Sequence, residues 1–207
     1  MIYLFDDYFD KYISVFSYLF ERSCFEKYSY SFIERKIAYS LMVNELERSN
    51  ITTIAFSSNE MIYNSIFPNY VINDFKASPY NIYGWLGFLY VHLFIDLKIT
   101  WEMLFILLPI KKAISMYNLY HEMDYRQSLD YVKSLFKYSN LNLIMEAKSI
   151  STNELASTTN IPVSTIRSLR YGIRDINKLA ASSLHKIANK LDVKIESLLS
   201  NIQLIVG

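Results

Sequence analysis

The 207-residue sequence has few of the residues that form metal sites, disulfides and tight turns: one cysteine, three histidines, four glycines and four prolines. The single cysteine, Cys24, has no partner in the chain for a disulfide, which is typical of proteins of the reducing cytoplasm. One cysteine and three histidines also leave too few ligands for an ordinary structural zinc site. GxGxxG, GxxxxGKS, HExxH and GxSxG motifs are missing as well. We therefore expect a cytoplasmic protein that is not an enzyme and has no metal or cofactor.

Charged residues are also sparse, at 20% of the chain, whereas 52% of the residues are hydrophobic and 16% are aromatic. This composition excludes a disordered chain and supplies enough apolar surface for a substantial core. Residues 77–95 carry no charge over the length of a bilayer span, but they include Pro79, Asn81 and His92. We interpret this stretch as a helix buried in a soluble core rather than as a transmembrane helix.

Apolar residues recur three and four positions apart along most of the chain, and this spacing predicts an all-α fold. Between Ser49 and Ser58, the β-branched run Ile-Thr-Thr-Ile predicts a short strand or an extended connector instead. Pro79 suits a first helical turn, Thr100 suits an N-cap, and Pro109 interrupts or restarts a helix. The helices predicted before residue 139 span residues 3–21, 32–47, 59–68, 79–96, 103–108, 110–120 and 125–138.

The composition of the chain changes near residue 140, and beyond this point Tyr171 is the only aromatic residue. Residues 1–139 contain 13 Lys/Arg and 15 Asp/Glu, a balance of −2, whereas residues 140–207 contain 8 and 5, a balance of +3. A change of composition and of charge sign at one place predicts a domain boundary. We expect an N-terminal helical bundle at 1–139, which dimerises or binds a partner, and a second domain at 140–207.

Two short helices joined by a tight turn are predicted within the second domain. Ser151 and Glu154 fit a capping box that begins the first helix. Asn160 tolerates the left-handed conformation of a sharp turn, Pro162 suits the first turn of the next helix, and Gly172 is typical of a helix end.

The second of these helices has a buried side and a polar side. Ile166 and Leu169 face inward, and Ala156 of the first helix is small enough to lie where the two helices cross. At 100° per residue, the outer side carries Ser164, Arg167, Ser168 and Tyr171. No acidic residue occurs between Asn160 and Arg174. A helix with such a face fits the major groove, where Ser and Arg hydrogen-bond to base edges.

The pattern resembles the helix-turn-helix of the Cro/phage-repressor (XRE) family, over residues 141–199. The matching positions are Leu155-Ala156, Asn160-Ile161, Ser164-Thr165-Ile166, Leu169 and Gly172, followed by Leu184, Ile187, Ala188, Leu191, Val193, Leu198 and Leu199. The resemblance implies a lambda-repressor-like five-helix domain. Three features depart from the family pattern: Asn160 replaces the usual glycine, Pro162 replaces the usual Ser/Thr cap, and residues 172–187 are longer than in the shortest members.

The resemblance also implies sequence-selective binding of double-stranded DNA, usually by a homodimer on an inverted repeat. The positions that match base-facing residues of the family are Val163, Ser164, Arg167 and Ser168. Thr152 matches a position that commonly meets the DNA backbone. Arg170, Arg174 and Lys178 extend the positive charge to where phosphates would lie. We expect a bacterial or phage regulator, most simply a repressor of transcription.

The N-terminal part leaves several functions open. Residues 83–87 and 117–124 resemble helical proteins encoded in bacterial toxin–antitoxin or defence-type operons, and this resemblance assigns no site residue. It makes an antitoxin that binds a protein toxin and autoregulates its operon the main alternative to a simple repressor. A ligand-sensing regulator is a further alternative, because the aromatic residues either form the core or line a pocket or peptide groove. His121-Glu122-Met123-Asp124 is interpreted as a helix end rather than a metal site.

Overall fold

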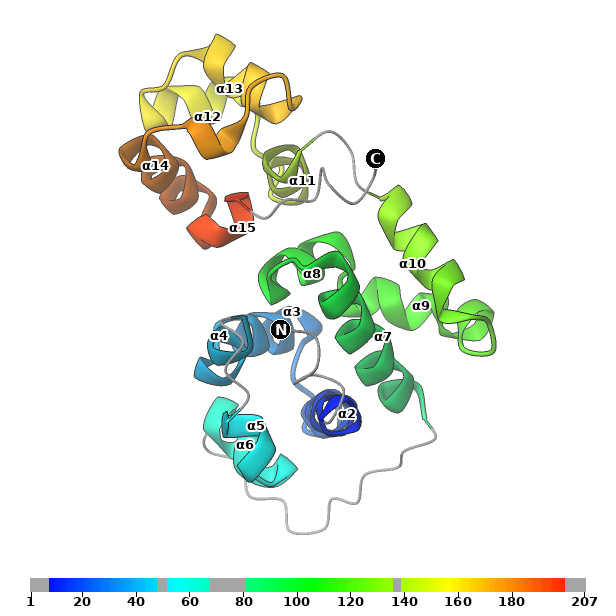
Figure 1. Cartoon of the computed structure of the whole chain (residues 1–207). Coiled ribbons are helices and arrows are strands. Elements are labelled where there is room, and N and C mark those ends of the chain that lie inside the picture. Colours follow the sequence, from blue (N-terminus) through cyan, green and yellow to red (C-terminus); the bar gives the residue numbers. More distant parts are fainter. Residues whose placement is uncertain (1–7, 48–51, 68–80, 136–138, 200–207) are drawn as a thin grey trace.

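The computed structural model describes residues 8–47, 52–67, 81–135 and 139–199, and within these ranges it contains no β-strand. The predicted all-α fold is therefore confirmed for the described residues. Helices α2 to α10 form the N-terminal part, and α11 to α15 form the C-terminal part (Figure 1). The N-terminal helices are α2 (Phe9–Phe25), α3 (Tyr30–Ala38), α4 (Leu41–Glu47), α5 (Thr52–Phe56), α6 (Asn59–Ile66), α7 (Ile82–Leu97), α8 (Trp101–Leu107), α9 (Ile110–Tyr120) and α10 (Tyr125–Ser134).

The N-terminal core is built around the indole ring of Trp101, the first residue of α8. This ring stacks on Phe16 of α2, with 4.0 Å between the ring centroids and 8° between the planes. Phe94 of α7 and Phe105 of α8 lie 5.4 and 5.7 Å from the indole centroid. Both Trp101 and Phe16 are fully buried. The aromatic residues of these four positions thus supply packing area to the core.

Helices α2 and α7 lie against each other, and Gly87 allows their close approach. A Cβ atom at Gly87 would lie 2.6 Å from the backbone nitrogen of Ser17 and 2.9 Å from the carbonyl oxygen of Ile13. Across the same contact, the Ser17 hydroxyl donates to the carbonyl oxygen of Gly84 over 3.3 Å. Because backbone atoms limit the space, only a residue without a side chain fits between these helices at position 87.

The single helix predicted for residues 32–47 is wrong, because α3 ends at Ala38 and α4 begins at Leu41. Ser40 separates the two helices. Its hydroxyl donates to the carbonyl oxygen of Ile37 over 2.9 Å and accepts the backbone N–H of Val43 over 3.2 Å. A serine in this role caps a new helix rather than continuing the old one. The apolar periodicity alone did not reveal the break.

The strand or extended connector predicted between Ser49 and Ser58 is also wrong, because residues 52–56 form α5. This short helix contacts α2 and α4, and its residue Ile54 is 1% exposed. The burial of Ile54 against these neighbours outweighs the β-strand preference of the Ile-Thr-Thr-Ile run. Residues 48–51 lie outside the described residues.

Most of the remaining predicted helices are found with small shifts at their ends. Helix α9 has the predicted bounds, and Thr100 caps α8 by accepting the N–H of Met103 over 3.2 Å. Helix α7 begins later than predicted, because Asn81 is its N-cap and accepts the N–H groups of Tyr83 and Gly84. Residues 3–7, Pro79, residues 136–138 and the apolar tail 201–206 lie outside the described residues.

The long uncharged stretch of the sequence contributes to α7. Within the described ranges no single helix has both the length and the hydropathy that a membrane span needs; α7 and α8 pass that test only together, and their axes are bent by 112°.

The C-terminal part consists of α11 (Asn140–Ala147), α12 (Thr152–Thr159), α13 (Val163–Arg170), the 3₁₀ turn η1 (Ile176–Lys178), α14 (Ala181–Leu191) and α15 (Ile195–Leu199). It rests on the N-terminal part through α11, which contacts α8, and through Lys194, which precedes α15. The ammonium of Lys194 donates to the carbonyl oxygen of Ala38 over 2.8 Å and to Oδ1 of Asn44 over 2.7 Å. The same ammonium lies 3.3 Å from Oε2 of Glu47.

A buried carboxylate completes this contact. Oε2 of Glu102, on α8, accepts the backbone N–H of Lys194 over 2.9 Å and the hydroxyl of Ser197 over 2.6 Å. Its other oxygen accepts the hydroxyl of Tyr39. Glu47 lies at the edge of the same contact, where burial raises its pKa. Hydrogen bonds from the backbone N–H of Trp101 and from the ammonium of Lys194 oppose that rise. One carboxylate, Glu102, thus joins α3, α8 and the start of α15.

Candidate nucleic-acid interface

Helices α12 and α13 are joined by the tight turn that the sequence predicts. Asn160 has φ 56° and ψ 38°, which is the left-handed conformation, and its N–H bonds to the carbonyl oxygen of Ala156. Ser151 caps α12 by accepting the N–H of Glu154 over 3.1 Å. The carboxylate of Glu154 forms an ion pair with Lys190 of α14 at 3.1 Å. Pro162 is the N-cap of α13 rather than its first residue, so the helix begins one residue later than predicted.

The crossing of the two helices is packed as predicted. Ala156 is 4% exposed, and its neighbours in this core are all buried: Leu155, Ile161, Ile166 and Leu169. Helix α14 closes this core with Ile187, Ala188 and Leu191, and Leu184 of the same helix is also buried. The buried stripe on α13 fixes how the helix is rotated, and therefore which side chains face outward.

The outward side of α13 carries the four residues predicted to face bases. Ser164 and Arg167 are exposed, Val163 is 38% exposed and Ser168 is half-buried. The Ser168 hydroxyl donates to the carbonyl oxygen of Ser164 over 2.9 Å, so its lone pairs remain available as acceptors. Arg167 forms no ion pair with any other described residue. The structure thus brings these four side chains together on one exposed helical face.

Thr152, the first residue of α12, lies close to Arg170, the last residue of α13. Nη1 of Arg170 donates to Oγ1 of Thr152 over 3.1 Å, and Nε of Arg170 donates to Oδ1 of Asn142 over 2.7 Å. Nη2 lies 3.8 Å from the carboxylate of Glu146. Because Thr152 accepts from Arg170, its own hydroxyl proton can point outward as a donor. The sequence placed Arg170 among the phosphate-binding residues, whereas in the structure its guanidinium connects α13 to α11 and α12.

The chain reverses sharply after α13. Gly172 has φ 69°, its N–H bonds to the carbonyl oxygen of Leu169 over 3.2 Å, and the N–H of Ile173 bonds to that of Ser168 over 2.9 Å. These bonds form a Schellman motif, in which glycine is favoured because of its positive φ. The helix end predicted at Gly172 is confirmed.

Two residues predicted to contact phosphates, Arg174 and Lys178, follow the end of α13. Arg174 and Lys178 are exposed, and neither forms an ion pair with another described residue. Asp175 lies between them and caps η1: the backbone and side-chain N–H groups of Asn177 each donate to it over 2.9 Å. These hydrogen bonds hold the pKa of Asp175 below its usual value. Its carboxylate is therefore used within the loop.

Two exposed residues of this surface were not singled out from the sequence. Asn153 follows Thr152 at the start of α12, where an exposed amide can reach a phosphate. Ile173 is 79% exposed beside Arg174, in the loop that follows α13. The position of Asn153 next to a helix N-terminus was a usable signal, whereas an apolar residue such as Ile173 gives no sign of exposure in the sequence.

The motif is turned away from the rest of the molecule. Figure 1 shows α12 and α13 on the side of the C-terminal part that is remote from α2 to α10, with α11 and α15 on the near side. The outer face of α13 is therefore accessible to a duplex. Among the described residues no group of three or more His, Cys, Asp or Glu side chains is arranged to hold a metal ion.

A capped helix, a sharp turn and a second helix with an exposed Ser/Arg face define a helix-turn-helix DNA-binding domain. Residues 140–203 match the family model of the Cro/C1-type HTH DNA-binding domain. The resemblance stated from the sequence is confirmed. No curated protein and no solved structure matches the chain. The domain match supports a DNA-binding regulator.

Proposed function

We propose that the protein is a sequence-specific repressor of transcription that binds double-stranded DNA through α13. The exposed face of Val163, Ser164, Arg167 and Ser168 carries this proposal, because it is accessible and positively charged and contains no carboxylate. Arg167 would donate two hydrogen bonds to guanine, and the serines would bind base edges. Arg174 and Lys178, in the segment that follows α13, would bind phosphates.

In this proposal the protein binds an inverted repeat as a homodimer. In this arrangement residues 140–207 form the DNA-binding domain, and residues 1–139 form the domain for dimerisation or partner binding. Two recognition helices would then enter successive major grooves about 34 Å apart. In this proposal the protein acts in the cytoplasm by binding and not by catalysis. When it occupies the operator, it blocks transcription of the adjoining genes.

A reporter assay tests the repressor proposal. The DNA upstream of the protein's own reading frame is placed before a reporter, and expression is measured with and without the wild-type protein. We expect repression by wild type and loss of repression by Arg167→Ala. Lys111→Ala is the matched control, because Lys111 is an exposed cation on α9 in the N-terminal part. Equal expression with wild type and without protein would contradict repression at this site.

One observation favours the antitoxin as a second candidate. Large apolar side chains are exposed on three helices of the N-terminal part: Phe25 at 54%, Phe56 at 83% and Met61 at 64%. Helices α5 and α6 both contact α2, so these residues lie on neighbouring elements. Exposed apolar side chains gathered on neighbouring helices are a feature of protein-binding surfaces. The test is co-purification with the product of the adjacent gene, which Phe56→Ser combined with Met61→Ser should abolish.

A further inference from the structure

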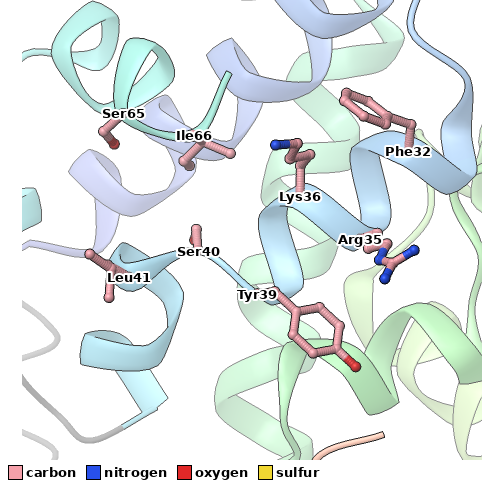
Figure 2. A pocket seen from close by; sticks show the side chains of 8 residues that line it. All are labelled: Phe32, Arg35, Lys36, Tyr39, Ser40, Leu41, Ser65 and Ile66. Atoms are coloured by element: carbon pink, nitrogen blue, oxygen red, sulfur yellow. The ribbon is translucent and has the colours of Figure 1, made fainter. Parts of the chain in front are cut away.

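A hollow opens on the N-terminal part between α3, α4 and α6. Its volume is about 550 Å³, which lies in the range of small-molecule sites. The residues that line it are Phe32, Arg35, Lys36, Tyr39, Ser40, Leu41, Ser65 and Ile66 (Figure 2). The hollow lies outside the helix-turn-helix, and the proposed DNA contacts make no use of it.

The lining combines aromatic rings with positive charge. Two of the eight residues, Arg35 and Lys36, are cationic, and none is acidic. In Figure 2 the Lys36 ammonium extends from α3 toward Ile66, whereas the Arg35 guanidinium points away from Ile66. The ammonium lies 5.5 Å from the ring centroid of Phe32 and forms no ion pair with another described residue. An anionic group here would meet a cation without a carboxylate competitor.

The apolar surface of the hollow suits a flat hydrocarbon group. Ile66 is 5% exposed and presents an apolar surface from α6. The residues Phe32 and Tyr39 are 39% and 45% exposed. Aromatic rings bind other rings by stacked or edge contacts. A ligand with an aromatic group and one anionic group fits both parts of this lining.

Tyr39 also connects the hollow to the DNA-binding domain. Tyr39 is one of the residues that line the hollow, and its hydroxyl donates to Oε1 of Glu102. Glu102 accepts the N–H of Lys194 and the hydroxyl of Ser197, both in the C-terminal part. The Lys194 ammonium also lies 5.3 Å from the centroid of the Tyr39 ring. A molecule that moves this ring therefore changes the contacts that hold α15.

We propose that the hollow binds a small aromatic carboxylate or sulfonate, and that its occupancy changes the affinity for DNA through Tyr39. Lys36 pairs with the anionic group, and the rings of Phe32 and Tyr39 contact the aromatic part. The binding is independent of the proposed function, whereas the change in DNA affinity rests on it. By linkage, a ligand that alters the affinity for DNA is itself bound with altered affinity when DNA is present.

The binding step is tested with the fluorescent aromatic sulfonate 8-anilinonaphthalene-1-sulfonate as the probe. We expect saturable binding to the full-length protein and at least tenfold weaker binding to Lys36→Gln. Lys112→Gln is the matched control and should bind as wild type does, because Lys112 is a half-buried lysine 5.6 Å from the Tyr131 ring centroid, on α9. Equal affinities in wild type and Lys36→Gln, or equal losses in the two lysine variants, would overturn the site.

The coupling step is tested by gel shift of a specific duplex with and without saturating probe. We expect the probe to change the DNA affinity of wild type at least fivefold. Tyr39→Phe, which keeps the ring and removes the hydroxyl, should still bind the probe but lose the change. An unchanged DNA affinity in wild type would overturn the coupling and leave the probe titration to decide the site. Failure to bind any duplex without probe would instead refute the proposed function.

Discussion

The guanidinium Nη1 of Arg170, the last residue of α13, donates to the hydroxyl of Thr152, the first residue of α12, over 3.1 Å. The same side chain donates to Asn142 of α11 over 2.7 Å. One arginine thus ties α13 to the two helices before it, and sets the direction in which the Thr152 hydroxyl can donate.

Arg170→Ala should lower the stability of the C-terminal part. It removes two charge-assisted hydrogen bonds from a side chain that is only 20% exposed, so we expect a loss of about 1–2 kcal/mol in the free energy of unfolding. Arg170→Lys should recover only part of this, because an ammonium lacks the planar geometry of the guanidinium. Denaturant unfolding monitored by circular dichroism measures the change. A variant as stable as wild type would contradict the structural role of Arg170.

Lys178→Ala should weaken binding to all duplexes alike. We assign this exposed lysine to a phosphate, so its removal should reduce the slope of log K against log salt concentration by about 1. Titrations of a specific and a random duplex at several salt concentrations provide the measurement, with Lys111→Ala as the control that keeps the wild-type slope. An unchanged slope for Lys178→Ala would show that this side chain meets no phosphate.

Gly87→Ala should destabilise the N-terminal part, because the added methyl group meets the backbone of α2 at 2.6 and 2.9 Å. A substitution that overpacks a helix contact costs about 1–3 kcal/mol. The Ser17 hydroxyl is also close to this position, so the double variant Gly87→Ala/Ser17→Ala separates the two causes. We expect no rescue in the double variant, measured by thermal unfolding. A full recovery would mean that the hydroxyl and not the backbone limits the space.

His92 should make stability depend on pH. Its ring lies 3.9 Å from Phe88 and 4.7 Å from Tyr125 between centroids, and burial lowers its pKa from 6.5, opposed by the hydrogen bond with the Phe88 carbonyl oxygen. The unfolded chain then binds the proton more tightly than the folded one. Its contribution to stability is complete above pH 6.5 and is lost as the pH falls through 6.5 toward the lower folded pKa.

Thermal unfolding at pH 7.5 and at pH 5.5 measures this effect. The melting temperature of wild type should fall on acidification, and the fall should be smaller for His92→Gln, which carries no titrating ring. An identical fall in both proteins would assign the pH dependence to other groups.

The sequence predicted the parts of the fold that depend on neighbouring residues. Asn160, Gly172 and the buried pair Ile166 and Leu169 are local signals, since a positive φ or a helical period needs only a few residues of chain. The exposed face of α13 followed from the same period. These signals sufficed for the helix-turn-helix.

The parts that the sequence did not predict depend on contacts between distant segments. The break at Ser40 lies beside Tyr39, whose hydroxyl meets Glu102 on another helix. The role of Arg170 depends on Asn142, which lies 28 residues earlier. The helical state of residues 52–56 depends on packing against α2. A local sequence pattern does not predict which distant side chain a residue will contact in the folded protein.

The most direct test of DNA recognition by α13 is selection of binding sites from randomised duplexes, followed by fluorescence anisotropy with wild type and Arg167→Ala. We predict an inverted-repeat consensus that wild type binds at least about 10³-fold more tightly than random duplex at physiological salt. Arg167→Ala should lose about 1–3 kcal/mol of affinity and its preference at one position of each half-site. The absence of any consensus, or unchanged base preferences in Arg167→Ala, would contradict the account.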